Sequence, residues 1–305
     1  MYKKILVPLD GSELAEAIFG YARCIALSLK GTDVHLLHIY GAEESKLTPM
    51  HQAYIERAVD TISHPPQEAT KEASSTAGFE VQGRLAAGKP AEQIIKYAEN
   101  NGIDLIMMAT HGRSGINRWA MGSVAYKVLR SAKVPVWLVR DGIEEEIIED
   151  LQPGRRILVP LDGSKKAEAV LPYVERLAQQ WRDKPTEIVL LRAYQPPSAS
   201  SDYLSDLPLN WEENTELEAA KCKLVVGPYL NEVEKRLKES GLEVRQEAPL
   251  GDPAEEIIKY ARSHHVSLIT MITHGRSGLS RWAYGSVAEE VMLGAYTPVL
   301  LVRSH

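Results

Sequence analysis

The feature that most constrains this chain is a long internal repeat. The segment KKILVPLDGSELAEA at Lys3 returns as RRILVPLDGSKKAEA at Arg155, and THGRSGINRWAMGSVA at Thr110 returns as THGRSGLSRWAYGSVA at Thr273. Repeats of this length are whole domains, because solenoid units usually span about 20 to 50 residues. A chain of 305 residues has room for two ordinary domains. The sequence therefore predicts two copies of one fold in tandem.

The spacing between repeated residues places an insertion in the second copy. Asp10 and Asp162 are 152 positions apart, whereas Gly112 and Gly275 are 163 positions apart. The 11 extra residues are best explained by the polar stretch QPPSASSDYLSDLPLN, rich in Pro and Ser, that follows Tyr194.

The repeat also suggests domain boundaries. We expect a first domain over residues 1–141 and a second over residues 155–305. The intervening residues 142–154 carry an acidic run and end in Pro-Gly, which is typical of a linker. Duplication by itself records only common descent. However, the best-matched segments include loops as well as core, and this favours a shared function.

Composition and charge narrow the class of protein. Hydrophobic residues make up 44% and charged residues 25%, as in soluble globular proteins. The formal net charge of −6 disfavours a general binder of nucleic acid or anionic membranes, and we find no apolar run of about 18 residues that could span a bilayer. Cys24 and Cys222 form no CxxC pair, which fits a reducing compartment. We therefore expect a cytoplasmic protein.

Periodicity within each copy predicts an α/β fold. The apolar runs expected to form strands in the first copy are ILVPL, VHLLHIY, FEVQGRLAA, DLIMMAT and PVWLV. The segments expected to be helical are 13–30 after a Ser12 cap, most of 47–76 with a break at Pro65-Pro66, 90–97, and 123–131. Alternating strands and helices predict a doubly wound, mainly parallel five-stranded sheet in each copy.

Two loops stand out as candidate ligand sites. The first strand ends in PLDGS at residues 8–12, and the fourth ends in THGRSG at residues 110–115. Ligands of open parallel sheets bind beyond the carboxyl ends of the strands, where the strand order reverses. If these two strands are neighbours, their loops form one crevice.

The residues of these loops suit an anionic ligand. Gly112 and Gly115 allow positive φ and a close approach of the backbone. The segment Gly122-Ser123-Val124 opens a helix whose free N–H groups and dipole suit a phosphate. The Asp10 carboxylate would repel a phosphate, but it suits a ribose hydroxyl, an adenine amine or a bound Mg²⁺. The matching residues of the second copy are Asp162, Gly275, Gly278, Gly285, Ser286 and Val287.

Each signal alone has a simpler interpretation. A Gly-rich loop is often only a tight turn, and Asp-Gly-Ser is also a sufficient turn and helix cap. Several residues have a structural role as their simplest interpretation. They are His111, His274, Arg118, Arg281, Trp119 and Trp282 in the loops, Pro90 and Pro253 at helix starts, and Met107, Met108 and Met271 in the fourth strand. The chain lacks a P-loop, a GxGxxG motif after its first strand and HExxH, which disfavours a motor ATPase or a dehydrogenase.

The motifs KKILVPLDGS, GKPAEQI and THGRSG…GSVA…VPVWLV resemble the universal stress protein family, nearly along the whole chain and twice. The resemblance implies domains of the adenine nucleotide α-hydrolase type with strand order 3-2-1-4-5. ATP-binding members carry G-x2-G-x9-G-[ST], and Gly112 with Gly122-Ser123 fits its latter part. The first glycine is Ala109 in one copy and Ile272 in the other. The branched Ile272 makes the second site less certain than the first.

The resemblance also implies further site residues and a ligand. Pro8, Asp10 and Ser12 would line the adenosine side, and the backbone of Ile39 would meet the adenine edge. The remaining residues that we assign to the two sites are Met108, Ala109 and Arg113 in the first copy, and Pro160, Asp162, Ser164, Ala193, Met271 and Arg276 in the second. The expected ligand is ATP, or ADP or AMP, and Mg²⁺ could enter with its phosphates.

Members of the family dimerise through their last strands. PVWLV and PVLLV are therefore expected to pair antiparallel within this chain as an internal pseudo-dimer, and a further homodimer is open.

Three functions remain under consideration. The leading hypothesis is a nucleotide-binding stress-response or regulatory protein whose conformation or partner affinity changes with ATP occupancy. The second is a slow ATP hydrolase that uses the same crevice, although the sequence fixes no general base. The third is a nucleotide-free interaction scaffold with residues 198–210 as its docking segment.

Overall fold

The computed structural model describes residues 2–16, 18–29, 31–64, 79–110, 121–140, 154–181, 184–194, 226–273 and 285–303. The strands of the first repeat are β1 (Lys4–Leu9), β2 (Asp33–Tyr40), β3 (Val81–Ala87), β4 (Leu105–Ala109) and β5 (Val136–Val139). Those of the second are β6 (Arg155–Pro160), β7 (Thr186–Leu191), β8 (Glu243–Glu247), β9 (Leu268–Ile272) and β10 (Val299–Val302).

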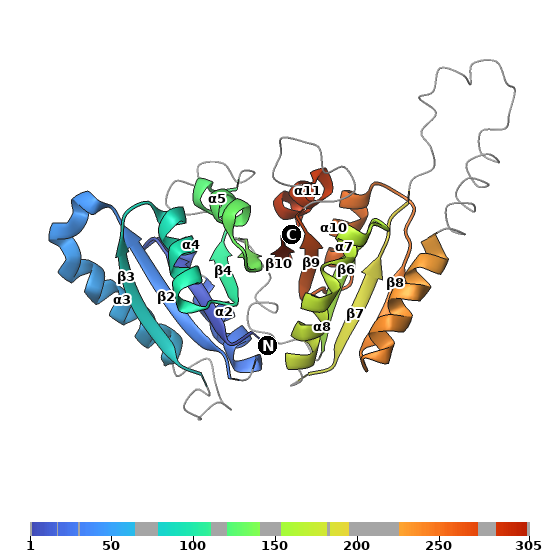
Figure 1. The fold of residues 1–305 in the computed structure, drawn as a ribbon, viewed down its shortest axis with the longest axis horizontal. Coiled ribbons are helices and arrows are strands. Elements are labelled where there is room, and N and C mark those ends of the chain that lie inside the picture. The colour runs from blue at the N-terminus through green and yellow to red at the C-terminus, as the bar shows by residue number, and fades with distance from the viewer. Residues whose placement is uncertain are drawn as a thin grey trace, which may run out of the picture.

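These strands form one continuous sheet across both repeats (Figure 1). Its order is β3-β2-β1-β4-β5-β10-β9-β6-β7-β8, so each repeat has the predicted order 3-2-1-4-5. Within each repeat all neighbouring strands are parallel. Strand β1 lies between β2 and β4, which confirms the neighbour relation that a shared crevice requires.

Helices cover both faces of the sheet, as expected of a doubly wound fold. In the first repeat they are α1 (Glu13–Glu16), α2 (Ile18–Ser28), the 3₁₀ helix η1 (Ala42–Leu47), α3 (Thr48–Ser63), α4 (Pro90–Asn101) and α5 (Ser123–Ser131). In the second they are α7 (Lys165–Glu168), α8 (Leu171–Gln180), a helix over residues 226–239, α10 (Pro253–Ser263) and α11 (Ser286–Gly294).

Two apolar cores result from this layering, one on each face of the sheet. The helices α2, α3, α8 and 226–239 cover one core, and α4, α5, α10 and α11 cover the other. Neighbouring residues of β1 alternate between them: Ile5 and Val7 face the first core, and Leu6 faces the second. Each core contains residues from both repeats, so the repeats share their interior.

Several predicted details differ from the structure or lie outside its described part. Helices α1 and α2 lie within the first predicted helix, on either side of residue 17, which is outside the described residues. Helix α4 runs four residues beyond the predicted end, to Asn101, and ends at Gly102, which is left-handed with φ of 60°. The Pro65-Pro66 break, the linker residues 142–153 and the insertion after Tyr194 lie outside the described residues.

The last strands of the two repeats join the halves of the sheet. Strand β10 pairs antiparallel with β5, with Trp137 opposite Leu300, and this confirms the predicted pairing. The ring of Trp137 is fully buried and lies edge-on to Trp181 at 6.0 Å and to Tyr21 at 5.9 Å between centroids. Trp181 follows α8, so aromatic contacts from both repeats reinforce the strand pairing.

Gln180, at the end of α8, holds the first repeat through hydrogen bonds. Its side-chain oxygen accepts from the Tyr2 N–H at 2.7 Å, and its amide nitrogen donates to the Tyr2 carbonyl at 2.7 Å and the Leu29 carbonyl at 3.0 Å. The side chain is 7% exposed. Hydrogen bonds of this kind are hard to replace with water because the site is buried.

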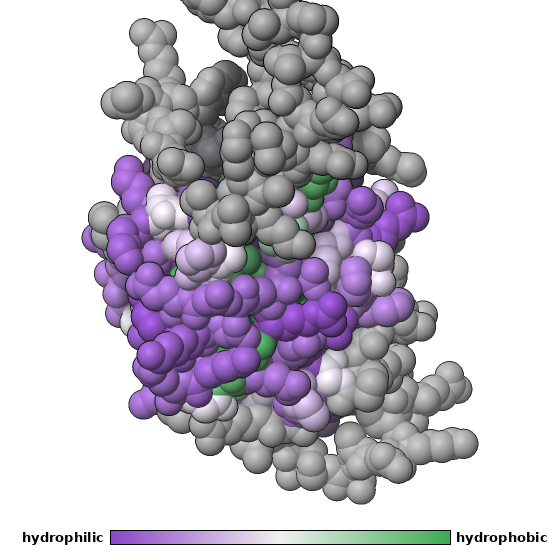
Figure 2. Space-filling model, turned by 90° about the vertical axis from the view of Figure 1, so that its right-hand side faces the viewer, coloured by the Kyte–Doolittle hydropathy of each residue, from purple (hydrophilic) through white to green (hydrophobic). Residues whose placement is uncertain are grey.

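The outer side of the second repeat is mostly hydrophilic. Figure 2 shows this side, which lies at the right of Figure 1 near β8, with only small apolar areas on its described surface. Among the described residues, no helix combines the length and the hydropathy that crossing a bilayer requires.

Candidate functional site

The turn after β1 holds the first candidate carboxylate in a fixed position. Gly11 adopts φ of 77°, a conformation that favours glycine. The backbone N–H of Ser12 and its hydroxyl both donate to Oδ1 of Asp10, at 3.0 and 2.6 Å. The Ser12 hydroxyl oxygen also accepts from the Ala15 N–H at 3.1 Å, which confirms the predicted cap. Asp10 is thus oriented by its own turn.

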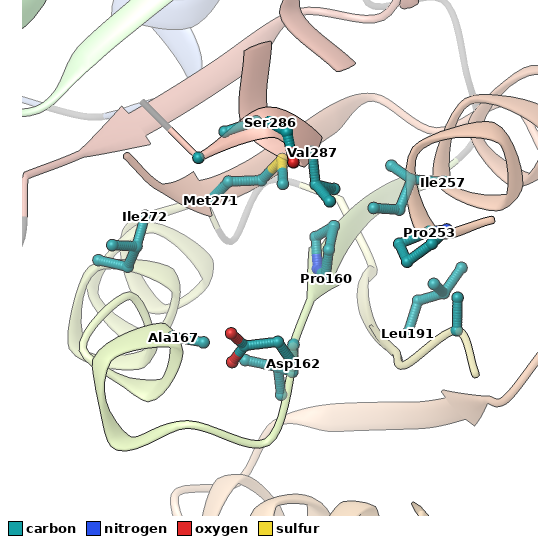
Figure 3. Close-up of a pocket in the computed structure, with 14 residues that line it drawn as sticks. Pro160, Asp162, Ala167, Leu191, Pro253, Ile257, Met271, Ile272, Ser286 and Val287 are labelled. Atoms are coloured by element: carbon teal, nitrogen blue, oxygen red, sulfur yellow. The ribbon is translucent and has the colours of Figure 1, made fainter. Parts of the chain in front are cut away.

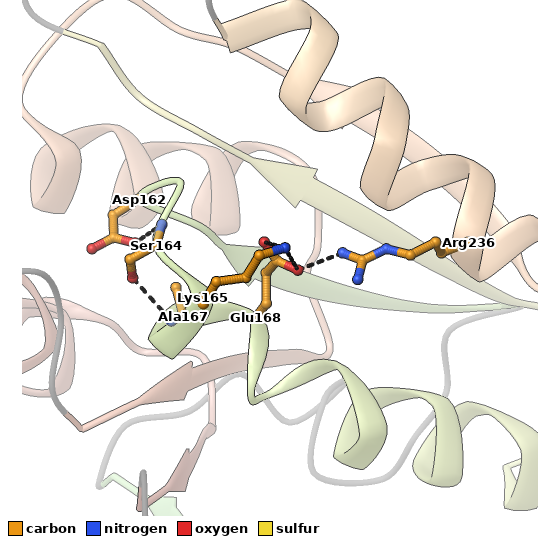
Figure 4. Close-up of polar contacts among 6 residues, drawn as sticks. All are labelled: Asp162, Ser164, Lys165, Ala167, Glu168 and Arg236. Carbon is orange, nitrogen blue, oxygen red and sulfur yellow. Dashed lines mark hydrogen bonds and ion pairs between the residues drawn. The ribbon is translucent and has the colours of Figure 1, made fainter.

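The second repeat builds the same turn after β6 (Figure 4). The Ser164 N–H donates to Oδ1 of Asp162 at 2.9 Å, and the Ser164 hydroxyl oxygen accepts from the Ala167 N–H at 3.1 Å. Beside it, the Glu168 carboxylate lies 2.6 Å from Arg236, on the helix over residues 226–239. This ion pair ties the start of the second repeat's first helix to its outer helix.

The helices that follow β4 and β9 begin without a capping side chain. Gly122 stands at the N-cap of α5 and Gly285 at that of α11, and neither helix has a side-chain cap hydrogen bond. Gly122 donates to the Thr110 carbonyl and Gly285 to the Thr273 carbonyl, both at 2.8 Å, so both helix starts are positioned by the ends of the strands. By contrast, Asp252 caps α10. An uncapped helix N-terminus suits an anionic ligand.

These elements enclose one cavity in the first repeat, with a volume of about 210 Å³. It brings together eight of the predicted site residues: Pro8, Asp10, Ile39, Met108, Ala109, Gly122, Ser123 and Val124. Ser12 is not among the described residues that line this cavity, but its hydroxyl donates a hydrogen bond to Asp10.

The second repeat encloses a matching cavity of about 230 Å³ (Figure 3). It brings together Pro160, Asp162, Ala193, Met271, Gly285, Ser286 and Val287. Ile272 lines the cavity without closing it. Figure 3 shows Ile272 beside Ala167 at one end, and Leu191, Pro253 and Ile257 at the other. Ser164, like Ser12, supports the neighbouring carboxylate.

Sequence reasoning missed part of the cavity wall. Pro90 and Ile94 of α4 line the first cavity, and Pro253 and Ile257 of α10 line the second. The two prolines open their helices as predicted, but they also form the apolar end of the cavity. The repeated segments GKPAEQI and GDPAEEI were the signal that could have indicated this role.

Part of each predicted site lies outside the described residues. This part comprises residues 111–120 and 274–284, and therefore Gly112, Arg113, Gly115, Gly275, Arg276 and Gly278, together with the loop histidines and tryptophans. Thr110 and Thr273, the last described residues before these loops, are both buried.

The two carboxylate turns are supported by different polar residues. In the first repeat, His38 Nδ1 lies 3.1 Å from the Leu9 carbonyl oxygen, and His38 Nε2 lies 2.9 Å from Nδ1 of His51. Because a carbonyl can only accept, His38 Nδ1 donates to Leu9, and His38 Nε2 shares a second hydrogen bond with His51 Nδ1. The Glu44 carboxylate lies 3.7 Å from His51 Nε2.

In the second repeat, Arg192 occupies the place of His38. Its guanidinium lies 4.9 Å from the centre of the Tyr229 ring and packs on Gly163, where a Cβ would lie 2.7 Å from the guanidinium carbon. Gly163 also has φ of 85°, a conformation that favours glycine, and an added Cβ would displace the guanidinium from this position. Burial, and to a smaller extent the nearby Glu168, raise the pKa of Tyr229 to about 12, while Arg192 opposes the shift.

Comparison with known proteins agrees with this geometry. The model of the universal stress protein family matches residues 1–140 and again residues 154–303. Universal stress protein MJ0577 of Methanocaldococcus jannaschii is 31% identical over 156 residues, which cover 46% of this chain and 96% of the relative. A putative universal stress protein of Staphylococcus epidermidis, SERP1273, is 34% identical over 157 residues, which cover 50% of this chain and 90% of the relative.

A solved structure shows the same fold over the full length. A universal stress protein from Archaeoglobus fulgidus aligns with a TM-score of 0.64 and 22% identity, covering 100% of both chains. The two family matches, the repeated strand order and the relatives that each span about half of the chain lead to one conclusion: this chain belongs to the universal stress protein family, as a tandem member with two domains.

Proposed function

We propose that each repeat binds an adenine nucleotide in the cavity at the carboxyl ends of its strands. One observation carries the proposal: an oriented carboxylate, an uncapped helix N-terminus and an apolar slot meet in one cavity, and they do so twice. The choice of adenine, and of ATP, ADP or AMP, rests on membership of the family. It also rests on the Gly-rich motif around Gly122 and Gly285.

The parts of the ligand can be assigned from the chemistry of the wall. The apolar end at Pro90 and Ile94 suits a flat base, and Asp10 suits the hydroxyls of a ribose. The first-turn amides of α5 suit a phosphate. A cavity of about 210 Å³ is smaller than the roughly 300 to 1,000 Å³ of typical ligand pockets. In this proposal it therefore holds the nucleoside and the first phosphate at the start of α5, and the outer phosphates extend beyond it.

A magnesium ion would be held mainly by the nucleotide. Among the described residues, no group of three or more His, Cys, Asp or Glu side chains is placed to bind a metal. In this proposal Mg²⁺ enters on the phosphates of ATP, and the Asp10 carboxylate lines the same cavity. Titrations with ATP in the presence of Mg²⁺ and in the presence of EDTA separate the contribution of the metal from that of the nucleotide.

We further propose that the pair of domains, 1–141 and 155–305, acts as one regulatory unit in the cytoplasm. In this proposal the two repeats, joined where β5 pairs with β10, act as an internal pseudo-dimer, and occupancy of either cavity alters the conformation or partner affinity of the whole. Sedimentation with and without ATP would reveal any further homodimer.

Isothermal titration with ATP and AMP tests the binding proposal. We expect heat from at least one nucleotide, and about tenfold weaker binding after Asp10→Asn with Asp162→Asn, because the charged acceptor is lost. Asparagine keeps the acceptor that orders each turn, so the fold should survive. Asp60→Asn is the matched control, since the Asp60 side chain is 77% exposed and far from the crevice in sequence. No heat from either nucleotide at millimolar concentration would overturn the proposal.

A further inference from the structure

The two cavities differ at only two equivalent wall positions among the described residues. Strand register and the paired backbone bonds of Tyr40 to Gly88 and of Tyr194 to Gly251 make Ile39 equivalent to Ala193. The pairings of Ala109 with Val139 and of Ile272 with Val302 make Ala109 equivalent to Ile272. Every other lining position carries the same residue type in both repeats.

The two differences are a reciprocal exchange. The first cavity has isoleucine near the end of β2 and alanine at the end of β4, whereas the second has alanine just after β7 and isoleucine at the end of β9. In both cavities the isoleucine is 8% exposed, and the alanine is half-buried. The volumes stay close, at about 210 and 230 Å³. The exchange therefore moves free space from one end of the cavity to the other rather than closing it.

The ends of the cavity differ in chemistry. Figure 3 shows Leu191, Pro253 and Ile257 gathered at one end, and Ile272 at the opposite end, with Asp162 and Ser286 between them. Ala193 follows Leu191 by two residues on an extended strand end, so its side chain points to the same face as that of Leu191. The apolar end suits a base, and the end at Ile272 is where the chain enters the loop toward the uncapped helix α11.

We propose that this exchange gives the two cavities different nucleotide preferences. The first cavity, open at Ala109, favours a nucleoside triphosphate. The second, narrowed at Ile272 and widened at Ala193, favours a nucleoside monophosphate. This inference rests on the proposed function. It adds that Ala109 and Ile272, with Ile39 and Ala193 at the other end, determine the specificity.

Counting bound nucleotide per chain tests the proposal. Titrations of the wild-type full chain with ATP should give one tight site and a second site weaker by about tenfold or more, since small changes in apolar bulk have effects of this size. AMP should fill two sites of similar affinity. Two ATP sites of equal affinity would overturn the proposal while leaving the proposed function intact. The absence of binding by either nucleotide would overturn both.

Reciprocal variants test whether these four residues cause the difference in nucleotide preference. The double substitution Ile39→Ala with Ala109→Ile gives the first cavity the wall of the second, at nearly constant volume. It should weaken the tight ATP site by about tenfold or more and leave AMP binding within about threefold. The matched variant Ala193→Ile with Ile272→Ala should strengthen the weak ATP site by a similar factor. Retained AMP binding reports that each variant is folded. Unchanged ratios of ATP to AMP affinity in both variants would overturn the assignment of these four residues.

If the double variants do not fold, Ile272→Val is the milder substitution. It removes one methylene from the narrowed end and should still strengthen ATP binding at the weak site, while AMP binding stays constant. A parallel change in ATP and AMP affinity would contradict the proposal, because it would indicate a general loosening of the wall.

Discussion

The walls of the two cavities are nearly the same, but the residues that support them differ. Behind the first carboxylate turn lies the buried pair of His38 and His51. Behind the second lies Arg192, which packs on Tyr229. The ring of Tyr54, on α3, contacts His38. One cavity geometry can thus be supported by a hydrogen-bonded pair of histidines or by an arginine packed on an aromatic ring.

The seam between the repeats is also asymmetric. Trp137 faces Leu300 across the antiparallel pair, so the first repeat supplies an aromatic ring where the second supplies an aliphatic side chain. Gln180 reaches from the second repeat into the first, whereas Ser28, at the equivalent place, donates to the Cys24 carbonyl within its own helix. The following predictions test these differences.

The largest effect is expected at Trp137. Trp137→Ala should reduce the free energy of unfolding by about 3 to 5 kcal/mol, because it removes a fully buried ring that contacts both repeats. Urea unfolding followed by circular dichroism measures the loss. Trp137→Phe keeps a ring in the seam and should lose less than half as much. Equal losses in the two variants would contradict this role of the ring, because Phe fills much of the space that Ala leaves empty.

A smaller loss is expected at Gln180. Gln180→Ala should reduce the free energy of unfolding by about 3 kcal/mol, because buried groups of Tyr2 and Leu29 lose their partner. The matched variant in the other repeat is Ser28→Ala, which removes only a bond within α2 and should change stability by less than about 1 kcal/mol. Similar losses in the free energy of unfolding for the two variants, measured by urea unfolding, would contradict the idea that only Gln180 bonds across the two repeats.

Helix capping should give an effect of about 1 kcal/mol. Asp252 accepts from the N–H groups of Ala254 and Glu255, so Asp252→Ala should destabilise the protein by that amount. Lys89 stands at the same place before α4 and makes no side-chain cap bond. Lys89→Asp should therefore stabilise by about 0.5 to 1 kcal/mol. Thermal melting detects both signs, and a loss of stability in Lys89→Asp would contradict the comparison.

The smallest effect concerns the pH dependence of stability. Burial lowers the pKa of His35, and the nearby Lys4 lowers it further. The folded state thus favours neutral His35. The corresponding stability is present above the unfolded pKa of about 6.5 and is lost as the pH falls from there toward the folded pKa. His35→Val copies Val189 of the second repeat, and it should flatten the decline of the urea midpoint below about pH 6.5. Identical pH profiles for the two proteins would contradict this role.

Much of the fold could be predicted from the sequence because its signals are local or repeated. The apolar runs located the strands, and Ser12 located a helix start. The family resemblance supplied the strand order, which places Asp10 and Ala109 at the ends of neighbouring strands. The prolines Pro90 and Pro253 were assigned only their local role as helix starts. Their place in the cavity wall depends on how α4 and α10 cross the strand ends, which no local pattern encodes.

The contacts between distant positions were not predictable in the same way. Gln180 and Tyr2 are separated by 178 residues, and nothing in either segment marks the other as its partner. The histidine pair is closer in sequence, but its geometry depends on the packing of α3 against β2. The reciprocal exchange of Ile39 and Ala109 became visible only when strand register aligned the two walls.

The covalent link between β5 and β10 changes how their pairing depends on protein abundance. Separate subunits must meet before such strands join, whereas strands tethered in one chain face each other at an effective concentration that dilution cannot lower. A cell holding few copies of the protein would keep both cavities together in a ratio of one to one. The tether also leaves only β3 and β8 as open edges in the described sheet, and the charged side chains on them, such as Arg84 and Glu243, discourage growth into a longer array.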